Sequence, residues 1–168
     1  MTDLILPDIV PIADAVPAEV EALLDAAFGR DRHKRTAYRL REGLQPIAGL
    51  SFAAIADGRL VGTLQSWRIA LSGAAGTVPL TLVGPVAVHP DSQNRGIGHA
   101  LMNALLMADA VSPMVLIGDT PYYGRFGFAA SADRQWTLPG PFEPNRLLVR
   151  ESADRRLPLT GALGARRD

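Results

Sequence analysis

Cysteine is absent from the 168 residues of this chain. Its absence excludes a disulfide framework, a thiol nucleophile and a thiolate metal site, and it fits a reducing cytoplasm, where we expect the protein to be found. Histidine is scarce, and His33, His89 and His99 lack the spacing of metal ligands on one element. We therefore predict no metal site.

Charge of one sign is not in excess either, because 17 basic residues balance 17 acidic ones. No global field then attracts nucleic acid or an anionic membrane, so binding must be local. No secretory signal is visible, and prolines and glycines interrupt the long uncharged run over residues 69–88, which predicts two strands around a turn. We expect no nucleic-acid partner and no membrane partner.

The length of the chain and its 48% of hydrophobic residues allow one substantial core. No internal repeat, low-complexity block or linker divides the sequence. We therefore expect residues 1–168 to form a single domain, in which residues 155–168 make a weakly ordered tail.

The most informative stretch covers residues 82–108, whose pattern predicts a strand, a turn and a helix. A β-branched run predicts a buried strand that ends near Val88, because Pro90 lacks a ladder donor. Apolar residues recur with helical spacing from Ile97 onward. Between strand and helix lies QNRGIG, residues 93–98, whose glycines let a ligand approach a helix N-terminus, where phosphate binds.

Two nucleotide motifs can be set aside at this turn. It has no Gly-Lys-Ser/Thr ending, as in the phosphate loop of nucleotide hydrolases, and no third glycine of the dinucleotide fingerprint. The turn instead resembles the core motif of the GNAT superfamily of N-acetyltransferases, Gln/Arg-x-x-Gly-x-Gly/Ala, through Gln93, Gly96 and Gly98. The alternative interpretation is a tight strand-to-helix turn that binds nothing.

A second motif strengthens the resemblance. The apolar run 114–117 is followed by YYGRFGF, in which Tyr123 stands four residues before the pair Gly127-Phe128, as is common in the family. The sequences of residues 118–123 and 136–142 resemble those of a poorly characterised bacterial branch of the superfamily. That branch implies no particular substrate.

The rest of the pattern predicts an α/β (α+β) fold with a mixed, mostly antiparallel sheet flanked by helices. A helical crossover places the strand at 114–118 parallel to the strand before the turn. The other expected elements are a first strand around residues 4–6, a helix from Pro17 to its cap at Gly29, a basic helix over 30–41, strands over 51–56 and 60–71 joined at Asp57-Gly58, a strand over 77–88, and last strands over 132–138 and 146–151.

The resemblance implies that acetyl-coenzyme A (acetyl-CoA) is the cofactor, held at a splayed pair of parallel strands. Its pantetheine arm would pair with one strand, and its pyrophosphate would bind the turn. The matching positions are Val86, Ala87, Val88, Gln93, Asn94, Arg95, Gly96, Ile97, Gly98 and His99. The basic stretch 30–41 is interpreted either as a rim that attracts an acidic substrate or a cofactor phosphate, or as a solvated helix face.

Acetyl transfer to an amine needs a proton for the departing thiolate and a neutral amine. Tyr123 matches the family's general acid, with an ordinary phenol pKa of about 10, unless it is a packed aromatic; Tyr122 is the weaker candidate. Residues 81–88 carry no carboxylate, so the base is uncertain. Asp119 is expected as base or ammonium ligand, or else as a helix cap, with His89 or a water chain as further options.

These observations predict an N-acetyltransferase that moves an acetyl group directly from acetyl-CoA to the primary amine of a small molecule or peptide. The sequence leaves open whether the protein forms a homodimer. The alternative is an acyl-CoA binding or sensing domain without turnover, which the missing carboxylate favours. Nucleic-acid binding is a poorer third, since it rests on the stretch 30–41 alone.

Overall fold

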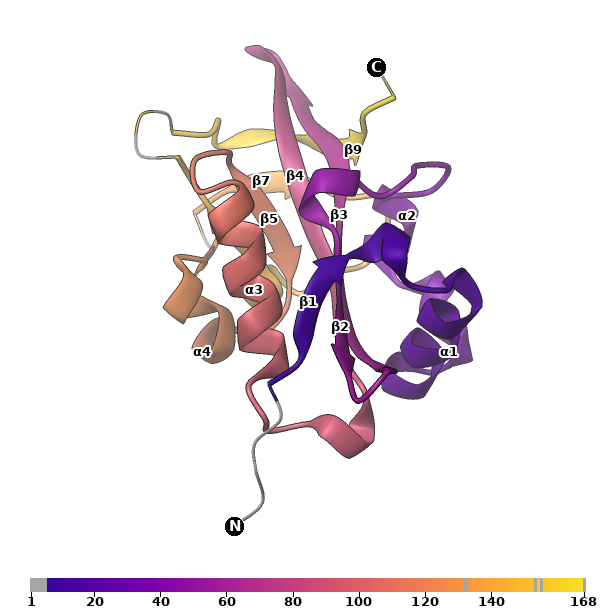
Figure 1. Ribbon diagram of the computed structural model, residues 1–168. Helices are drawn as coiled ribbons and strands as arrows, with labels where there is room; N and C mark the ends of the chain where they lie inside the picture. The colour runs from indigo at the N-terminus through magenta and orange to yellow at the C-terminus, as the bar shows by residue number, and fades with distance from the viewer. Residues whose placement is uncertain (1–5, 132, 153, 155, 168) are drawn as a thin grey trace. The chain divides into compact units, whose positions relative to one another are not determined.

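The computed structural model describes residues 6–131, 133–152, 154 and 156–167 (Figure 1). The chain folds as two compact units. Unit 1 is made of the described residues within Met1–Arg32, Pro46–Ser66 and Pro85–Ala110, and unit 2 of those within His33–Gln45, Trp67–Gly84 and Val111–Asp168. The long strands β3 (Arg59–Gly73) and β4 (Gly76–Val88) each contribute residues to both units.

Unit 1 contains the predicted hairpin. Strand β1 (Asp8–Pro11) pairs antiparallel with β2 (Phe52–Ala56), which pairs antiparallel with β3. Asp57 and Gly58 join β2 to β3 with φ of 51° and 73°, the positive values that a two-residue hairpin turn requires. Short 3₁₀ helices η1 (Ile12–Asp14) and η3 (Ala48–Leu50) flank these strands.

Two helices complete unit 1. Helix α1 (Pro17–Phe28) begins at the predicted proline, and its buried side chains Val20, Leu23 and Leu24 pack in a cluster with Ala87 of β4. Strand β4 ends at Val88, and the 3₁₀ helix η4 (Pro90–Ser92) leads to helix α3 (Ile97–Ala108), which contacts β1 and β2. The predicted order of strand, turn and helix is confirmed.

Unit 2 contains both parallel and antiparallel strand pairs. Strand β5 (Met114–Ile117) pairs parallel with β4, as predicted, and antiparallel with β8 (Leu147–Arg150), which pairs with β6 (Ala129–Ala130). Strand β9 (Thr160–Ala165) lies antiparallel to β3 and parallel to β7 (Gln135–Thr137). The predicted fold class, a mixed and mostly antiparallel sheet with flanking helices, is therefore confirmed.

Unit 2 contains a cluster of buried apolar side chains from these strands and from the segments that connect them. Helix α2 (Thr36–Leu40) adds Leu40, and the helical turns α4 (Thr120–Tyr123), η5 (Gly124–Phe126) and η6 (Pro144–Arg146) connect the strands. Buried members of this core include Leu40, Trp67, Ile69, Leu71, Leu82, Trp136 and Leu147. None of the helices in the described part of the chain is long and apolar enough to cross a membrane.

Three expectations differ from the structure at the ends of elements. Residues 4 and 5 of the expected first strand lie outside the described residues, Leu6 is exposed, and the first strand is β1. Of the strands expected over 132–138 and 146–151, residue 132 lies outside the described residues, and the observed strands are shorter, at Gln135–Thr137 and Leu147–Arg150. The stretch expected as a weakly ordered tail contains β9, whose small residues carry little β-propensity but gain backbone partners on both sides.

The expected basic helix over 30–41 is wrong as one element. The structure has a 3₁₀ helix η2 (Arg30–Lys34), then Arg35 in an extended conformation with ψ of 148°, then helix α2. A single amphipathic helix would keep its arginines in water, whereas Arg32 is only 2% exposed. Arg32 instead forms ion pairs with Glu21 and Asp25 of α1.

Candidate functional site

The glycine turn of unit 1 forms an open helix N-terminus. Gly96 is the residue before α3, with φ of 78° and ψ of 12°, and its carbonyl accepts the N–H of Ala100 at 3.0 Å. Asn94 also has a positive φ, of 64°. Residues 93–96 are exposed, so the turn that leads to the positive end of this twelve-residue helix is open to solvent. This arrangement can hold an anion such as a phosphate.

The strand segment before the turn, residues 86–88, alternates in burial. Ala87 is buried against α1, whereas Val86 and Val88 are half-buried. Past the segment, the N–H of His89 donates to the carbonyl of Val61 at 2.8 Å, which ties the end of β4 to β3. The segment is thus a fixed extended backbone that stops just before the turn.

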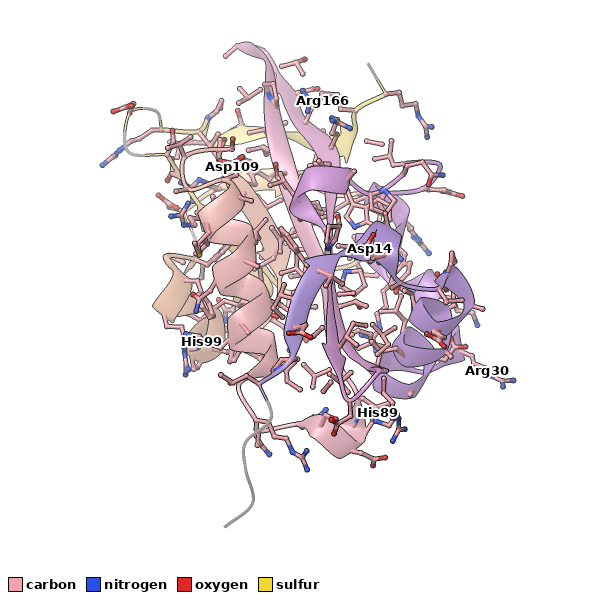
Figure 2. The ribbon with its side chains drawn as sticks, in the orientation of Figure 1. Asp14, Arg30, His89, His99, Asp109 and Arg166 are labelled. Carbon is pink, nitrogen blue, oxygen red and sulfur yellow. The ribbon has the colours of Figure 1, made fainter. Side chains whose placement is uncertain are left out.

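The side chain of His89 serves the local turn. Its Nδ1 accepts the backbone N–H of Asp91 at 3.1 Å, and it lies 3.7 Å from the Asp91 carboxylate. Figure 2 labels His89 at this end of β4, and His99 and Asp109 at the two ends of α3. His89 therefore has a structural role at the end of the strand, which was the alternative to its being a second-line candidate for the base.

Gly62 of β3 brings the strand segment and the helix together, and sequence reasoning missed it. A Cβ on Gly62 would lie 2.8 Å from Cγ2 of Ile97, 3.1 Å from the carbonyl oxygen of Ala87 and 3.2 Å from Cδ1 of Leu101. No side chain fits there, because real Cβ contacts essentially never fall below 3.0 Å. The first turn of α3 and the β4 backbone therefore pack directly on the β3 backbone.

Tyr123 in unit 2 lies in an aromatic cluster. Its ring meets Tyr122 edge to face at 4.8 Å between centroids and Phe128 at 6.4 Å. The pKa of Tyr123 is raised to about 12, mainly by burial and also by the neighbouring Tyr122 and Asp119, while Arg146 acts to lower it. The expectation of an ordinary phenol is thus corrected, because this hydroxyl holds its proton more tightly.

Tyr122 differs from Tyr123 in its surroundings. The Arg125 guanidinium lies 5.2 Å from the centre of the Tyr122 ring. Burial raises the pKa of Tyr122, and Arg125 lowers it. Because Tyr122 is less enclosed than Tyr123, it remains the weaker candidate for a proton donor.

Asp119 neither caps α4 nor stands alone. Within the described residues, its side chain makes no capping hydrogen bond, although it occupies the N-cap position. It forms an ion pair with Arg146, whose Nη1 lies 3.0 Å from Oδ1, and the two side chains are 70% and 46% exposed. Arg146 was not predicted, because nothing in the local sequence links it to Asp119.

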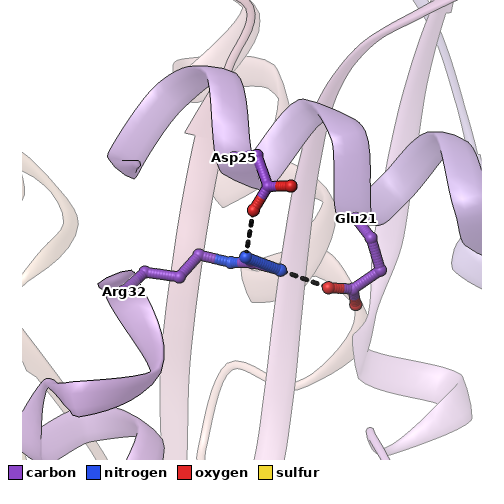
Figure 3. A network of polar contacts seen from close by, with 3 residues as sticks. All are labelled: Glu21, Asp25 and Arg32. Atoms are coloured by element: carbon purple, nitrogen blue, oxygen red, sulfur yellow. Dashed lines mark hydrogen bonds and ion pairs between the residues drawn. The ribbon is translucent and has the colours of Figure 1, made fainter. Parts of the chain in front are cut away.

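The basic stretch divides between the two units. Arg32 in unit 1 is buried and donates to Glu21 and Asp25 of α1 (Figure 3), so it fixes η2 to α1 and is not part of a solvent-facing rim. Arg41 in unit 2 lies between two rings, 3.8 Å from the centre of Tyr38 and 4.2 Å from that of Trp67. The interpretation of the stretch as one charged surface is wrong for these two residues.

Trp67 fixes β4 just before the strand segment. Its indole Nε1 donates to the carbonyl of Gly84 at 2.6 Å, and Gly84 has a φ of 132° that departs from a regular strand. In the parallel pairing between β4 and β5, Thr81 pairs with Met114 and Leu82 pairs with Val115. Strand β5 continues to Ile117. The irregular backbone at Gly84 therefore follows the point where the described pairing with β5 ends.

A sequence profile of the acetyltransferase (GNAT) domain matches residues 9–131. The match covers most of the chain and includes the glycine turn, β4, β5 and Tyr123. This chain therefore belongs to the GNAT acetyltransferase family, a class of acyltransferases.

Particular relatives agree with this assignment. The uncharacterized N-acetyltransferase YjhQ of Escherichia coli strain K12 is 25% identical over 128 residues, which is 74% of this chain and 71% of that protein. The GNAT family N-acetyltransferase YhbS of Escherichia coli, crystallised with CoA, has a TM-score of 0.70 at 22% identity, covering 96% of this chain and 91% of that one. A GNAT acetyltransferase of Brucella melitensis, crystallised with acetyl-CoA, has a TM-score of 0.66 at 24% identity, covering 95% and 96% of the two chains.

Proposed function

We propose that this protein is a cytoplasmic N-acetyltransferase that moves an acetyl group from acetyl-CoA directly to a primary amine, and that residues 1–168 make up one N-acetyltransferase domain. The observation that carries the proposal is the exposed turn before α3, with Gly96 in the left-handed region and the helix N-terminus open to solvent. The two relatives crystallised with CoA and acetyl-CoA support it.

The residues of this chain fit the proposed cofactor. The turn leads into the positive end of a helix and carries no carboxylate over residues 93–99, so it suits a pyrophosphate. The extended backbone of Val86 to Val88 suits an amide-bearing arm, because it can exchange N–H and C=O hydrogen bonds with it. The positions proposed to bind the cofactor are Val86, Ala87, Val88, Gln93, Asn94, Arg95, Gly96, Ile97, Gly98 and His99.

When bound, acetyl-CoA supplies an acetyl group activated as a thioester. We assign to Tyr123 the role of a proton-holding group that donates a hydrogen bond to the sulfur as negative charge grows there. Its pKa of about 12 exceeds the ordinary thiol value of about 8.5. Complete proton transfer from Tyr123 therefore costs roughly 5 kcal/mol, and hydrogen-bond donation is the favoured contribution.

We assign to Asp119 the binding of the acceptor's ammonium. Its carboxylate is exposed and paired with a single exposed arginine, so the pair opens at little cost and a ligand cation can replace Arg146. The proton that the amine must lose then goes to Asp119 or to solvent. Residues 81–88 of β4 offer no carboxylate for that step.

The lack of a carboxylate on β4 favours a second candidate, an acyl-CoA binding or sensing domain without turnover. One experiment separates the two. Calorimetric titration with CoA, followed by measurement of thiol release from acetyl-CoA with a broad panel of primary amines, should show binding and then turnover. Binding without thiol release from any amine would favour the sensing domain, and absence of CoA binding would overturn both.

A further inference from the structure

Gly118 follows β5 and lies directly beneath the ring of Tyr123. Its N–H donates to the carbonyl of Arg146 at 2.9 Å, which fixes its backbone. A Cβ on Gly118 would lie 2.6 Å from Cε2 and 2.9 Å from Cδ2 of Tyr123, well inside ordinary contact distances. Glycine is required there because the phenol ring occupies the space of a side chain.

The ring of Tyr123 has little freedom to move away from Gly118. Tyr122 and Phe128 pack against it, with interplanar angles of 86° and 72°. Its backbone is held as well, because its N–H donates to the carbonyl of Asp119 at 3.0 Å and its carbonyl accepts the N–H of Phe128 at 3.4 Å. A methyl group on Gly118 would therefore displace the ring, and the hydroxyl with it.

We propose that Gly118 is a positioning residue for Tyr123, which sets where the phenol hydroxyl is presented. This inference rests on the proposed function, in which Tyr123 donates at the sulfur. Gly118 acts through the ring of Tyr123; a Cβ there would also lie 3.1 Å from Cδ1 of Leu116, which is the end of a flexible side chain and can shift.

The test is Gly118→Ala made in two backgrounds, the natural protein and the Tyr123→Phe variant. With Tyr123 present, turnover should fall by up to about 10²-fold, the effect of a displacement of about 1 Å at a reacting group. In the Tyr123→Phe background, the residual turnover should not change, because the hydroxyl is already gone. The melting temperature should fall in both backgrounds, because both rings meet the new methyl group.

A titration that does not depend on turnover tests the role of Gly118 independently of the proposed function. The phenol absorbance of Tyr123, obtained by subtracting the titration of Tyr123→Phe, should show that Gly118→Ala lowers the pKa from about 12 toward 10 as the ring is displaced into water. If no amine is acetylated, the proposed function fails, and this titration still decides whether Gly118 holds the ring.

Control variants distinguish positioning of Tyr123 by Gly118 from a nonspecific loss of stability. Gly164→Ala in β9 should alter none of these readouts, because no heavy atom of the described chain lies within 4 Å of a Cβ there. If Gly118→Ala does not fold, the double variant Gly118→Ala with Tyr123→Ala should fold as well as Tyr123→Ala, since the clash is then removed. An equal loss of turnover in both backgrounds, an unchanged pKa, or failure of the double variant to recover would overturn the inference.

Discussion

The carboxylate of Asp119 and the guanidinium of Arg146 meet at 3.0 Å on the surface of unit 2, where the chain enters the turn that carries Tyr123. Two side chains that are 70% and 46% exposed gain little from such a contact, typically about 0–1 kcal/mol. A pair that contributes so little to folding is free to exchange partners with a charged ligand.

The first prediction therefore concerns Asp119→Asn. We expect the free energy of unfolding to change by less than about 1 kcal/mol, and the KM for an amine substrate to rise because its ammonium loses a carboxylate partner. Asp133→Asn, an exposed carboxylate elsewhere in unit 2, is the matched control and should leave KM unchanged. An unchanged KM in Asp119→Asn would show that the acceptor binds elsewhere.

The second prediction concerns the glycine turn. Gly96→Glu places a side chain and a negative charge where φ is 78° and a pyrophosphate is proposed to bind, so CoA affinity should fall by at least about tenfold. Gly96→Asn, which tolerates the left-handed region and adds no charge, should lose much less. Calorimetry on folded variants checks this, and equal affinities for Gly96→Glu and the natural protein would remove the turn from the site.

The third prediction separates the two tyrosines. Tyr123→Phe keeps the ring and removes the hydroxyl, so turnover should fall by about 10²–10³-fold, the usual effect of losing one preorganised hydrogen-bond donor, while CoA affinity and melting temperature stay nearly constant. Tyr122→Phe should be much milder. The measurement is single-turnover acetyl transfer with a substrate for which chemistry limits the rate. Natural turnover in Tyr123→Phe would make Tyr123 a packing residue.

The fourth prediction follows from the raised pKa of Tyr123. Below pH 10 the phenol is protonated in both the folded and the unfolded chain, so its contribution to stability is fully present. As pH rises from 10 through about 12, the unfolded phenol ionises first, and stability is lost by about 3 kcal/mol. Urea unfolding at pH 8 and at pH 11 to 12 measures this loss. Tyr123→Phe should reduce it, and an identical loss in that variant would contradict the assignment.

The fifth prediction concerns Arg32, whose buried guanidinium donates to Glu21 and Asp25. Arg32→Ala should lower the free energy of unfolding by about 2 kcal/mol, because it removes both ion pairs and leaves a cavity beside α1. Lys34→Gln, at an exposed position of the same 3₁₀ helix, should change it by less than about 0.5 kcal/mol. Urea unfolding compares them, and equal small effects would mean that Arg32 does not fix η2 to α1.

Sequence reasoning succeeded where the determining contacts are close along the chain. The Asp57-Gly58 turn, the cap at Gly29 and the start of α3 at Ile97 each depend on a few adjacent residues. The apolar spacing of α3 also predicts which of its faces is buried. These features follow from local backbone preference and amphipathic periodicity.

The features that the sequence did not predict depend on contacts between distant parts of the chain. Arg32 looks like any other member of a basic stretch until α1 supplies its two carboxylates. Gly62 and Gly118 carry no sequence signal that separates a close-packing glycine from an ordinary one, and the distances to Ile97 and Tyr123 alone reveal their roles. The pKa of Tyr123 likewise depends on burial, which no local pattern specifies.

Strand β9 lies between β3 and β7 and supplies hydrogen-bond partners to both. Proteolytic loss of Thr160–Ala165 would leave the backbone amides of β3 and β7 without those partners and present two templates for another chain to join. C-terminal trimming of this protein should therefore cause aggregation before it causes any loss of chemistry, and an affinity tag is better placed beyond Arg167 than in exchange for the last strand.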